Sequence, residues 1–354
     1  MRDVASADAP GRVNLIGEHT DYHDGYVLPT VIPQRTRVDL TRRRDRRVRV
    51  SSDLMGDGSL EYELGREAPG HGWLDYVQGV TVMLARTGAT IPGLDLRITS
   101  SVPVGAGVSS SAALEVSLLR ALRQLIGLDI DDLSLARIAQ TVETEFVGAP
   151  VGIMDQVAAS LGRDGEALFV DTRTLTVERV PMPPAIELVV IDSGVPHAHA
   201  GGAYATRRRE SFAAARRLHV DCLRELDVTA LPRLEALPPV LARRARHIIT
   251  ENGRVLDAVA ALRESDVERL GALFTASHAS MRDDYETSTP EVDALVRIGR
   301  QHPAIYGARM TGGGFGGAVV MLASTGSGAT AAAEIREQYS DATGRNARVL
   351  VPPT

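Results

Sequence analysis

The stretch SVPVGAGVSSSAALEVSLLRALRQL, from Ser101 to Leu125, combines a glycine turn, three serines and an apolar helical pattern. Gly105 and Gly107 have no Cβ atom, so backbone N–H groups near them can approach an anion closely. The serines from Ser109 to Ser111 add hydroxyl donors, and the helix that follows supplies unpaired N–H groups and the positive end of its dipole. On this stretch alone, a phosphate-binding loop is slightly favoured over a serine-capped helix after a glycine turn.

The chain contains no lysine, because all 39 of its Lys and Arg residues are arginine. This absence excludes the lysine of the Walker A phosphate loop, the lysine that protein kinases place on ATP, and any Schiff-base lysine. A nucleotide site in this chain therefore has to hold phosphate with backbone N–H groups and hydroxyls, while a metal ion neutralises charge.

The composition bounds the class of protein. The chain has 354 residues, of which 44% are apolar and 24% charged, as in an ordinary globular protein of two domains or one large one. The net charge of −6 argues against a general nucleic-acid binder. Cys222 has no partner for an internal disulfide, the N-terminus lacks an apolar signal core, and no apolar run approaches the ~20 residues of a membrane span. We expect a cytoplasmic monomer or weak homo-oligomer without nucleic-acid or membrane partners.

Alternating apolar residues predict strands on both sides of a turn at Arg44–Asp45, and a further strand at Leu94–Ile98. The run RRRDRR at this turn could attract a polyanion. A solvated hairpin is favoured instead, because aromatic residues are absent from the run and the rest of the chain is acidic.

Helical spacing predicts several helices after the serine loop. One should be capped by Asp132 or Ser134 and should end near Gly148. Two separate helices are predicted at Pro239–Thr250 and Asn252–Ser265.

A second glycine cluster, at Gly312, Gly314 and Gly317, satisfies G-x-G-x-x-G. The dinucleotide-binding motif requires a helix directly after the glycines, whereas AVVMLA predicts a buried strand. The dehydrogenase interpretation is therefore rejected. A tight loop against a ligand and a plain turn into a strand both remain open.

The segment GRVNLIGEHTDYHDGY, residues 11–26, is rich in hydrogen-bonding side chains. Carboxylates and a histidine in one loop suit the hydroxyls of a sugar, although a capped turn with incidental charges is the alternative. Metal binding by His19, Asp21 and His23 has no strong support from their spacing.

Several segments together resemble one family. APGRVNLIGEHTDY resembles the signature of galactokinases, and VPVGAGVSSSAALEV resembles the phosphate loop of the wider GHMP small-molecule kinases. FVGAPVGIMDQ, SHASMRDDYE and RMTGGGFGG are also similar to galactokinase segments and occur in the expected order. The resemblance implies an α+β fold of two domains with the active site in the interdomain cleft. We place the N-terminal GHMP kinase domain at residues 1–180 and the C-terminal one at 181–354, with the proline-rich Pro181–Pro184 at the boundary.

The resemblance also implies a role for each matching residue. Asp155 would be the catalytic base that faces the C1 hydroxyl of galactose, and Arg12 would stabilise charge on the phosphoryl group that moves. The other implied residues are Glu18, His19, Thr20, Asp21 and Tyr204 at the sugar, Gly105, Ala106, Gly107, Val108, Ser109, Ser110 and Ser111 around the ATP phosphates, and Ser111 and Glu143 as ligands of Mg²⁺.

The chemistry of these residue types agrees with the implied roles. Phosphoryl transfer depends mostly on positioning and electrostatic stabilisation, and an aspartate within reach can accept or orient the hydroxyl proton. Arg12 nearby would keep Asp155 ionised, and a serine hydroxyl with a carboxylate offers the hard oxygens that Mg²⁺ prefers. The alternatives are that Asp155 caps a helix, Glu143 is merely solvated and Tyr204 belongs to the core.

The chain departs from the family pattern at three positions. His23 stands where asparagine is common, Ala203 where glutamate is common, and Ala318 where cysteine is common. The first two could shift sugar preference. The prediction is an ATP-dependent galactose 1-kinase; the alternatives are a kinase of another monosaccharide and a non-catalytic sensor of sugar and nucleotide. His197 and His199 form an H-x-H pair without an evident third ligand, so a loop role is favoured for them.

Overall fold

The computed structural model describes residues 2–54, 56, 58–196 and 202–352, which form two compact units. Unit 1 comprises Met1–Arg12, Val31–Pro103 and Ser109–Gly162. Unit 2 comprises Val13–Thr30, Val104–Val108 and Arg163–Thr354. The chain therefore passes between the units several times. The H-x-H pair at His197 and His199 lies outside the described residues.

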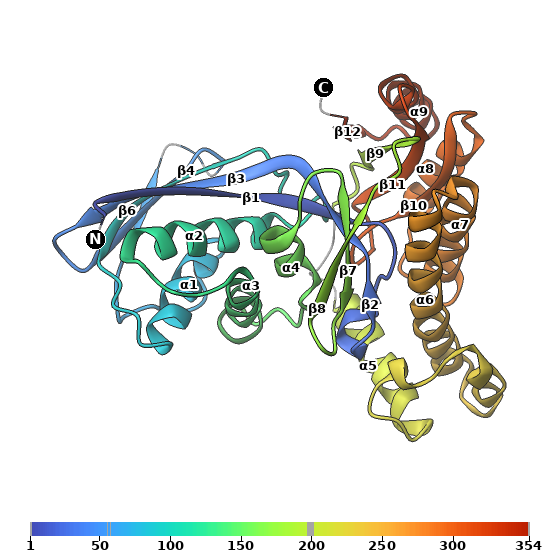
Figure 1. Ribbon diagram of the computed structural model, residues 1–354, viewed down its shortest axis with the longest axis horizontal. Coiled ribbons are helices and arrows are strands. Elements are labelled where there is room, and N and C mark those ends of the chain that lie inside the picture. Colours follow the sequence, from blue (N-terminus) through green and yellow to red (C-terminus); the bar gives the residue numbers. More distant parts are fainter. Residues whose placement is uncertain (1, 55, 57, 197–201, 353–354) are drawn as a thin grey trace. The chain divides into compact units, whose positions relative to one another are not determined.

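Unit 1 is built on a twisted sheet (Figure 1). Its strands are most of β1 (Val4–Asn14) and β3 (Pro29–Arg43), with β4 (Arg47–Ser52), β5 (Ser59–Glu63) and β6 (Gly93–Ser100). β6 pairs antiparallel with β3 and parallel with β4, and β4 pairs antiparallel with β5. The predicted turn at Arg44–Asp45 and the strand at Leu94–Ile98 are confirmed. The sequence interpretation that put all of residues 11–26 in one loop was wrong for Arg12 and Asn14, which lie in β1 because that strand pairs with β3.

Period-two burial explains why this sheet forms one face of a core. In β4, Val48 and Val50 are buried, whereas Arg49 between them is exposed, and Val38 and Leu40 of β3 are likewise buried at alternate positions. Helices cover the buried face (Figure 1). They are α1 (Leu74–Arg86), α2 (Ser110–Ile126), α3 (Asp132–Thr141) and α4 (Met154–Leu161).

The helix predicted to be capped by Asp132 or Ser134 is capped one residue earlier than expected. Asp131 is its N-cap, and its side chain accepts the Ser134 N–H at 2.6 Å. The helix continues from Thr141 into a π-helical turn, η2 (Val142–Val147), and ends at Gly148 with φ 81°, as the sequence indicated. Such one-residue expansions occur frequently at functional sites.

Unit 2 contains an antiparallel four-stranded sheet in the order β10-β11-β9-β12. The strands are β9 (Ile186–Asp192), β10 (Ile305–Met310), β11 (Ala318–Ser324) and β12 (Arg348–Val351). β11 follows the second glycine cluster directly and is buried over nearly its whole length, as predicted. In the same unit β7 (Glu166–Asp171) pairs with β2 (Tyr26–Val27), β8 (Thr176–Pro181) and Thr30 of β3.

The helices of unit 2 pack around this sheet and against one another. They are α5 (Ala203–Arg217), α6 (Pro239–Glu264), α7 (Val267–Asp283), α8 (Pro290–Gln301) and α9 (Gly328–Thr343), with short 3₁₀ turns η1 (Asp21–His23), η4 (Leu223–Glu225) and η5 (Val228–Ala236). α7 packs on β10, and α6 runs beside α7 (Figure 1).

The prediction of two helices at Pro239–Thr250 and Asn252–Ser265 was wrong, because α6 is continuous. The side chain of Asn252 donates to the carbonyl of Ile248 at 3.0 Å, one turn earlier, and so reinforces the helix where a break was expected. Burial of the apolar residues on both sides of this point supplies the rest of the stabilisation.

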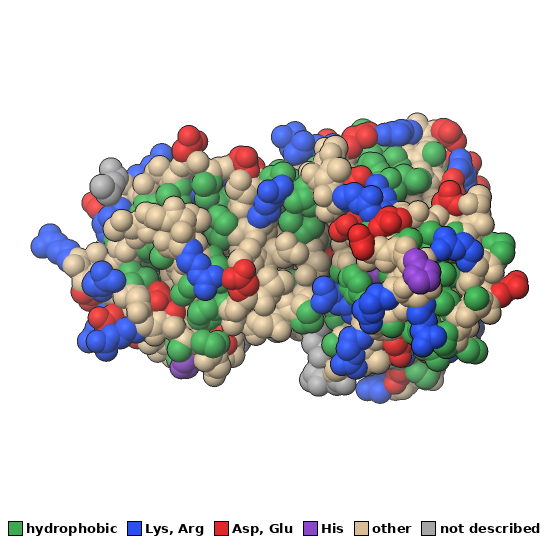
Figure 2. All heavy atoms as spheres, turned by 90° about the horizontal axis from the view of Figure 1, so that it is seen from below, with side chains coloured by type: hydrophobic (Ala, Val, Ile, Leu, Met, Phe, Trp, Pro, Cys, Tyr) green, Lys and Arg blue, Asp and Glu red, His purple; other side chains and the backbone are tan. Residues whose placement is uncertain are grey.

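The charged surface of unit 2 is mixed. Arginine side chains gather on the face shown in Figure 2, where aspartate and glutamate side chains lie among them. Within the part of the chain that the structure describes, no helix has the length and apolar character needed to cross a bilayer.

Candidate functional site

Arg12 and Asp155 form a fork-shaped ion pair in unit 1. Nε and one terminal nitrogen of Arg12 donate to the two carboxylate oxygens of Asp155 at 2.8 and 2.9 Å. Arg12, near the end of β1, is only 4% exposed, while Asp155 opens the first turn of α4. Ser109 adds a third donor, since its Oγ lies 2.5 Å from Asp155 Oδ2. The structure thus brings a buried cation, a carboxylate and a serine of the predicted phosphate loop to one point.

Ser111 and Glu143, the predicted metal ligands, are also together in unit 1. Oγ of Ser111 donates to Glu143 Oε1 at 2.9 Å, and Nε2 of Gln156 donates to the same oxygen at 3.0 Å. Glu143 lies on the π turn and is 5% exposed, so the alternative of a merely solvated glutamate is wrong. The two hard oxygen donors are side by side.

Burial, followed by the negative charge of Asp155, raises the pKa of Glu143 to about 7, although its bonds from Ser111 and Gln156 oppose this shift. Glu115, on α2, is fully buried, and neither of its carboxyl oxygens has a hydrogen-bond partner among the described residues. Burial first, and then the charges of Glu143 and Asp155, raise the pKa of Glu115 well above its usual range. Glu115 was not predicted as a site residue, because its only signal in the sequence was a carboxylate inside an apolar helical pattern.

The serine loop has the backbone geometry of an anion site. Gly105 and Gly107 have φ values of 79° and 73°, and Ser109 has φ 62°. Ser109 precedes α2, yet its hydroxyl binds Asp155 and makes no capping bond to the helix among the described residues. The first-turn N–H groups of α2 therefore receive no side-chain acceptor from Ser109. Ala106 and Val108 are buried and anchor the loop.

In unit 2, His19 lies within an aromatic cluster. Its ring centroid is 5.4 Å from that of Tyr204 and 4.6 Å from that of Tyr285, and Nδ1 lies 2.9 Å from the hydroxyl of Tyr22. The hydroxyls of Tyr22 and Tyr285 are 2.7 Å apart. His247 completes the cluster, with its ring 4.6 Å from that of Tyr285. Half-buried Tyr204 therefore joins a polar aromatic group that has both apolar faces and hydroxyls, which suits a sugar ring.

Glu18 and Thr20 are committed to contacts inside unit 2. One carboxylate oxygen of Glu18 accepts the Gly312 N–H at 3.1 Å, and the other accepts from Arg309. Burial raises the pKa of Glu18, while Arg309 opposes the shift. The hydroxyl of Thr20 lies within reach of the carbonyls of Gly17 and Tyr26 at 2.8 and 2.6 Å. Glu18 therefore connects the signature segment to the second glycine cluster, whereas Thr20 connects two parts of the signature segment.

Asp21 and His23 occupy the turn η1 and face different partners. Oδ1 of Asp21 accepts the N–H of Tyr22 at 3.0 Å. His23 is fully buried; Nε2 lies 2.8 Å from Ser211 Oγ, and Nδ1 accepts the Leu223 N–H. Burial, followed by the charge of Arg208, lowers the pKa of His23 to about 3. The histidine that departs from the family pattern thus joins η1 to α5 and η4 as a neutral side chain.

Two further charged residues of unit 2 were missed from the sequence. Arg309, in the RMTGGGFGG segment, is fully buried and also donates to the carbonyls of Asn14 and Leu15. Glu251 is fully buried beside it. Burial alone would raise the pKa of Glu251, but nearby Arg254, His247 and Arg309 lower it to about 2. The spacing of His247 and Glu251, one helical turn apart, was the available signal.

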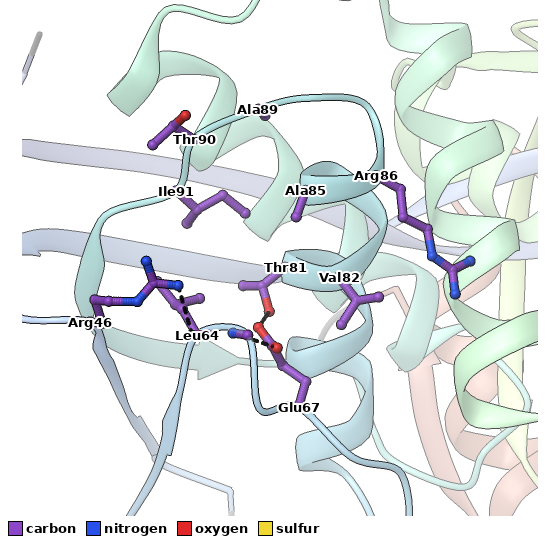
Figure 3. Close-up of a pocket in the computed structure, with 11 residues that line it drawn as sticks. Arg46, Leu64, Glu67, Thr81, Val82, Ala85, Arg86, Ala89, Thr90 and Ile91 are labelled. Carbon is purple, nitrogen blue, oxygen red and sulfur yellow. Dashed lines mark hydrogen bonds between the residues drawn. The ribbon is translucent and has the colours of Figure 1, made fainter.

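A surface hollow of about 540 Å³ lies beside α1 in unit 1 (Figure 3). Arg46, which donates to the carbonyl of Leu64 at 3.0 Å, and Glu67, which accepts from Thr81 at 3.1 Å, mark its polar side. None of the predicted site residues lines this hollow. Throughout the described ranges, no three His, Cys, Asp or Glu side chains are grouped as a protein-only metal site would require.

Three family models match the chain. The galactokinase galactose-binding signature covers residues 2–42, the GHMP kinases N terminal domain covers 75–163, and the GHMP kinases C terminal model covers 258–341. The first contains Arg12 and the segment around His19, and the second contains Ser111, Glu143 and Asp155.

Individual proteins agree with the family models. A galactokinase from Roseiflexus sp. (strain RS-1) is 43% identical over 349 residues, which are 97% of this chain and 89% of that protein. The crystal structure of Lactococcus lactis galactokinase complexed with galactose matches with a TM-score of 0.93 at 32% identity, over 98% of this chain and 92% of that one. Mevalonate kinase from Methanococcus jannaschii shares the fold, with a TM-score of 0.72 at 17% identity over 97% and 96% of the two chains. The resemblance read from the sequence and the α+β GHMP kinase fold are confirmed, and the chain belongs to the galactokinase family of GHMP kinases.

Proposed function

We propose that this protein transfers the γ-phosphoryl group of ATP to the C1 hydroxyl of galactose. The observation that carries the proposal is the three-way contact of Arg12, Asp155 and Ser109, which puts a carboxylate, a cation and the phosphate loop at one point. Phosphoryl transfer needs these groups held in position more than it needs covalent chemistry. Membership of the galactokinase family supports galactose as the sugar and ATP as the nucleotide.

Asp155 acts as the base that accepts or orients the proton of the attacking hydroxyl. The fork from Arg12 fixes both carboxylate oxygens, which supports a positioned base over a helix cap. Arg12 stabilises the charge that develops on the phosphoryl group, because a guanidinium keeps its charge and offers several donors in fixed directions.

The loop from Gly105 to Ser111 binds the ATP phosphates. Left-handed backbone at Gly105, Gly107 and Ser109 is the observation that supports this role. A chain with no lysine has to rely on such backbone and hydroxyl donors.

Ser111 and Glu143 hold Mg²⁺ together with the nucleotide. Their donor set fits this ion, since both are hard oxygens 2.9 Å apart and Glu143 is held by a second donor, Gln156. When bound, Mg²⁺ would neutralise phosphate charge, and Ser111 and Glu143 would supply part of its ligands.

At the sugar we propose His19, Asp21 and Tyr204 as the side chains that contact hydroxyls and the ring face. Glu18 and Thr20 belong to the same site, and their contacts support a role in holding the signature segment. The ring contacts of His19 with Tyr204 support the placement of the sugar beside this cluster.

The proposal also covers the boundary between the two domains and the cellular compartment of the protein. We propose residues 1–180 and 181–354 as the N- and C-terminal GHMP kinase domains, and the two GHMP models fall on either side of that limit. A cytoplasmic location is supported by the single cysteine of the chain.

The direct test is ATP consumption over a panel of monosaccharides, with the phosphorylated carbon of each product identified by NMR. Galactose should be used best and phosphorylated at C1. Preference for another monosaccharide would establish the first alternative. Tight binding of sugar and ATP without turnover of any sugar would establish the sensor.

A further inference from the structure

The signature segment from Gly17 to Tyr26 contains two non-glycine residues with left-handed backbone. His19 and Asp24 have φ values of 65° and 57°, and Gly17 has φ 106°. Residues other than glycine rarely adopt left-handed backbone, because the Cβ atom approaches the carbonyl oxygen. The hydroxyl of Thr20, which lies within reach of the carbonyls of Gly17 and Tyr26, holds this path from inside the segment, and contacts from outside the segment help to impose it.

Three of these outside contacts come from α6. His247 and Glu251 are four positions apart and share a helix face, and Asn252 follows Glu251 directly. Nε2 of His247 lies 3.1 Å from the carbonyl oxygen of Glu18, and Glu251 accepts the Gly17 N–H at 3.0 Å. Asn252 accepts the Tyr26 N–H at 2.9 Å. All three bonds end on backbone atoms, so they fix the path of the segment at both of its ends.

The three side chains are themselves held in place. His247 and Glu251 are fully buried, and Asn252 is 6% exposed. Ser280 and Ser277 bond the first two at 3.0 and 2.6 Å. Burial lowers the pKa of His247 to about 4, so the ring is neutral, and its N–H lies on Nε2 because the carbonyl oxygen of Glu18 can only accept.

The fit between α6 and the segment leaves no free space at the points of contact. A Cβ atom on Gly17 would lie 2.9 Å from Cγ2 of Val255, and one on Gly25 would lie 2.5 Å from Oδ1 of Asn252. The segment therefore lies directly against a rigid, buried surface.

We infer that His247, Glu251 and Asn252 are positioning residues that set the affinity of the protein for its sugar by imposing the backbone path of the signature segment. The inference rests on the proposed function, in which His19 and Asp21 of this segment contact the sugar. His247, Glu251 and Asn252 belong to unit 2, whereas the groups proposed to act on the phosphates, Arg12, Asp155, Ser111 and Glu143, belong to unit 1. Their loss should therefore affect sugar binding and spare the groups proposed to act on the phosphates.

The first experiment is steady-state kinetics on the full chain. His247→Leu and Asn252→Ala should each raise KM for galactose about tenfold, the change expected from one lost buried hydrogen bond, with kcat and KM for ATP nearly unchanged. His247→Gln should restore most of the affinity, because a glutamine amide N–H can take the place of Nε2–H. Ile249→Ala is the matched control: it truncates a buried residue of α6 that makes none of these bonds. An equal rise of KM in this control would overturn the inference.

The second experiment does not depend on catalysis. Hydrogen exchange of the amides between Gly17 and Tyr26 should be faster in His247→Leu and Asn252→Ala, and unchanged in Ile249→Ala. Unchanged exchange in the first two variants overturns the inference even if galactose is the substrate. If the wild-type protein does not phosphorylate galactose, the proposed function fails, while faster exchange still supports the role of α6 as a support for the segment. If His247→Leu does not fold, Asn252→Ala and His247→Gln carry both experiments.

Discussion

The cluster around Asp155 in unit 1 and the signature segment in unit 2 are held by different kinds of bond. In the first, side chains bond side chains: Arg12 and Ser109 bind Asp155, and Ser111 binds Glu143. In the second, side chains of α6 bond backbone atoms. Bonds between side chains control charge and proton position, whereas bonds to backbone control shape. In the proposed function, the first region acts on phosphate and the second recognises the sugar.

The largest effect of a substitution is expected on kcat, when the carboxylate of Asp155 is replaced. Asp155→Asn should lower kcat about 10³-fold, because the amide cannot accept the hydroxyl proton, while both KM values change little. Asp39 provides a matched control in the same unit, since it is also held by an arginine and a serine, Arg37 and Ser6, but is partly exposed. Asp39→Asn should leave kcat within about twofold. Near-normal turnover of Asp155→Asn would remove Asp155 as the base.

The next largest effect is expected on the free energy of unfolding, when the buried ion pair of Glu18 and Arg309 in unit 2 is broken. Glu18→Gln leaves the guanidinium of Arg309 without its closest carboxylate in a fully buried position, so we expect a loss of about 3 kcal/mol in the free energy of unfolding. Glu178→Gln, which breaks the exposed pair with Arg263, should cost less than about 1 kcal/mol. Denaturant unfolding of both variants tests this, and equal losses would refute the anchoring role of Glu18.

The raised pKa of Glu143 predicts a pH-dependent requirement for metal. Its ionised fraction increases from roughly a tenth at pH 6 to roughly nine-tenths at pH 8 if its pKa is about 7, and only the ionised form binds Mg²⁺ well. The Mg²⁺ concentration for half-maximal activity should therefore fall roughly tenfold over this range. Glu143→Gln should lose this pH dependence. A wild-type profile that matches the profile of this variant would exclude Glu143 as a ligand.

The smallest effect is expected at Glu115. Because its pKa is raised in the folded state, folding retains a proton that the unfolded chain releases, so its contribution to stability is full at acid pH and decreases as the pH rises above the usual glutamate range. Glu115→Gln removes this dependence and should raise the melting temperature by a few degrees at pH 8, with little change at pH 5. Thermal scans at both values test this, and a lower melting temperature at pH 8 would contradict the assignment.

The sequence predicted the parts of the molecule that depend on local signals. The strand at Leu94–Ile98, the turn at Arg44–Asp45 and the strand after the second glycine cluster follow from alternation and turn residues, and all three are present. The break expected before Asn252 is absent, because the side chain of Asn252 supports the helix and tertiary packing carries it through.

The site was predictable only in part, because its contacts join residues that are distant in the sequence. Short motifs named Arg12, Asp155, Ser111 and Glu143, but they did not show that Ser109 binds Asp155, a contact between residues 46 positions apart. Arg309 lies in the quoted RMTGGGFGG segment but was not singled out in it, and Glu251 lies in no quoted motif, because the importance of both follows from burial, which one sequence does not reveal.

The π turn at Val142–Val147 makes the number of residues in this segment as important as their identity. Each residue of an α-helix advances the chain by about 100° around the axis, so deleting one residue would convert the wide turn into a regular one and rotate the two sides of it against each other by that angle. If Gly148 stayed in its place at the end of the π turn, the side chain of Glu143 would then point away from Ser111. Exchanges of exposed residues such as Glu145 should be tolerated here, but single-residue deletions should not.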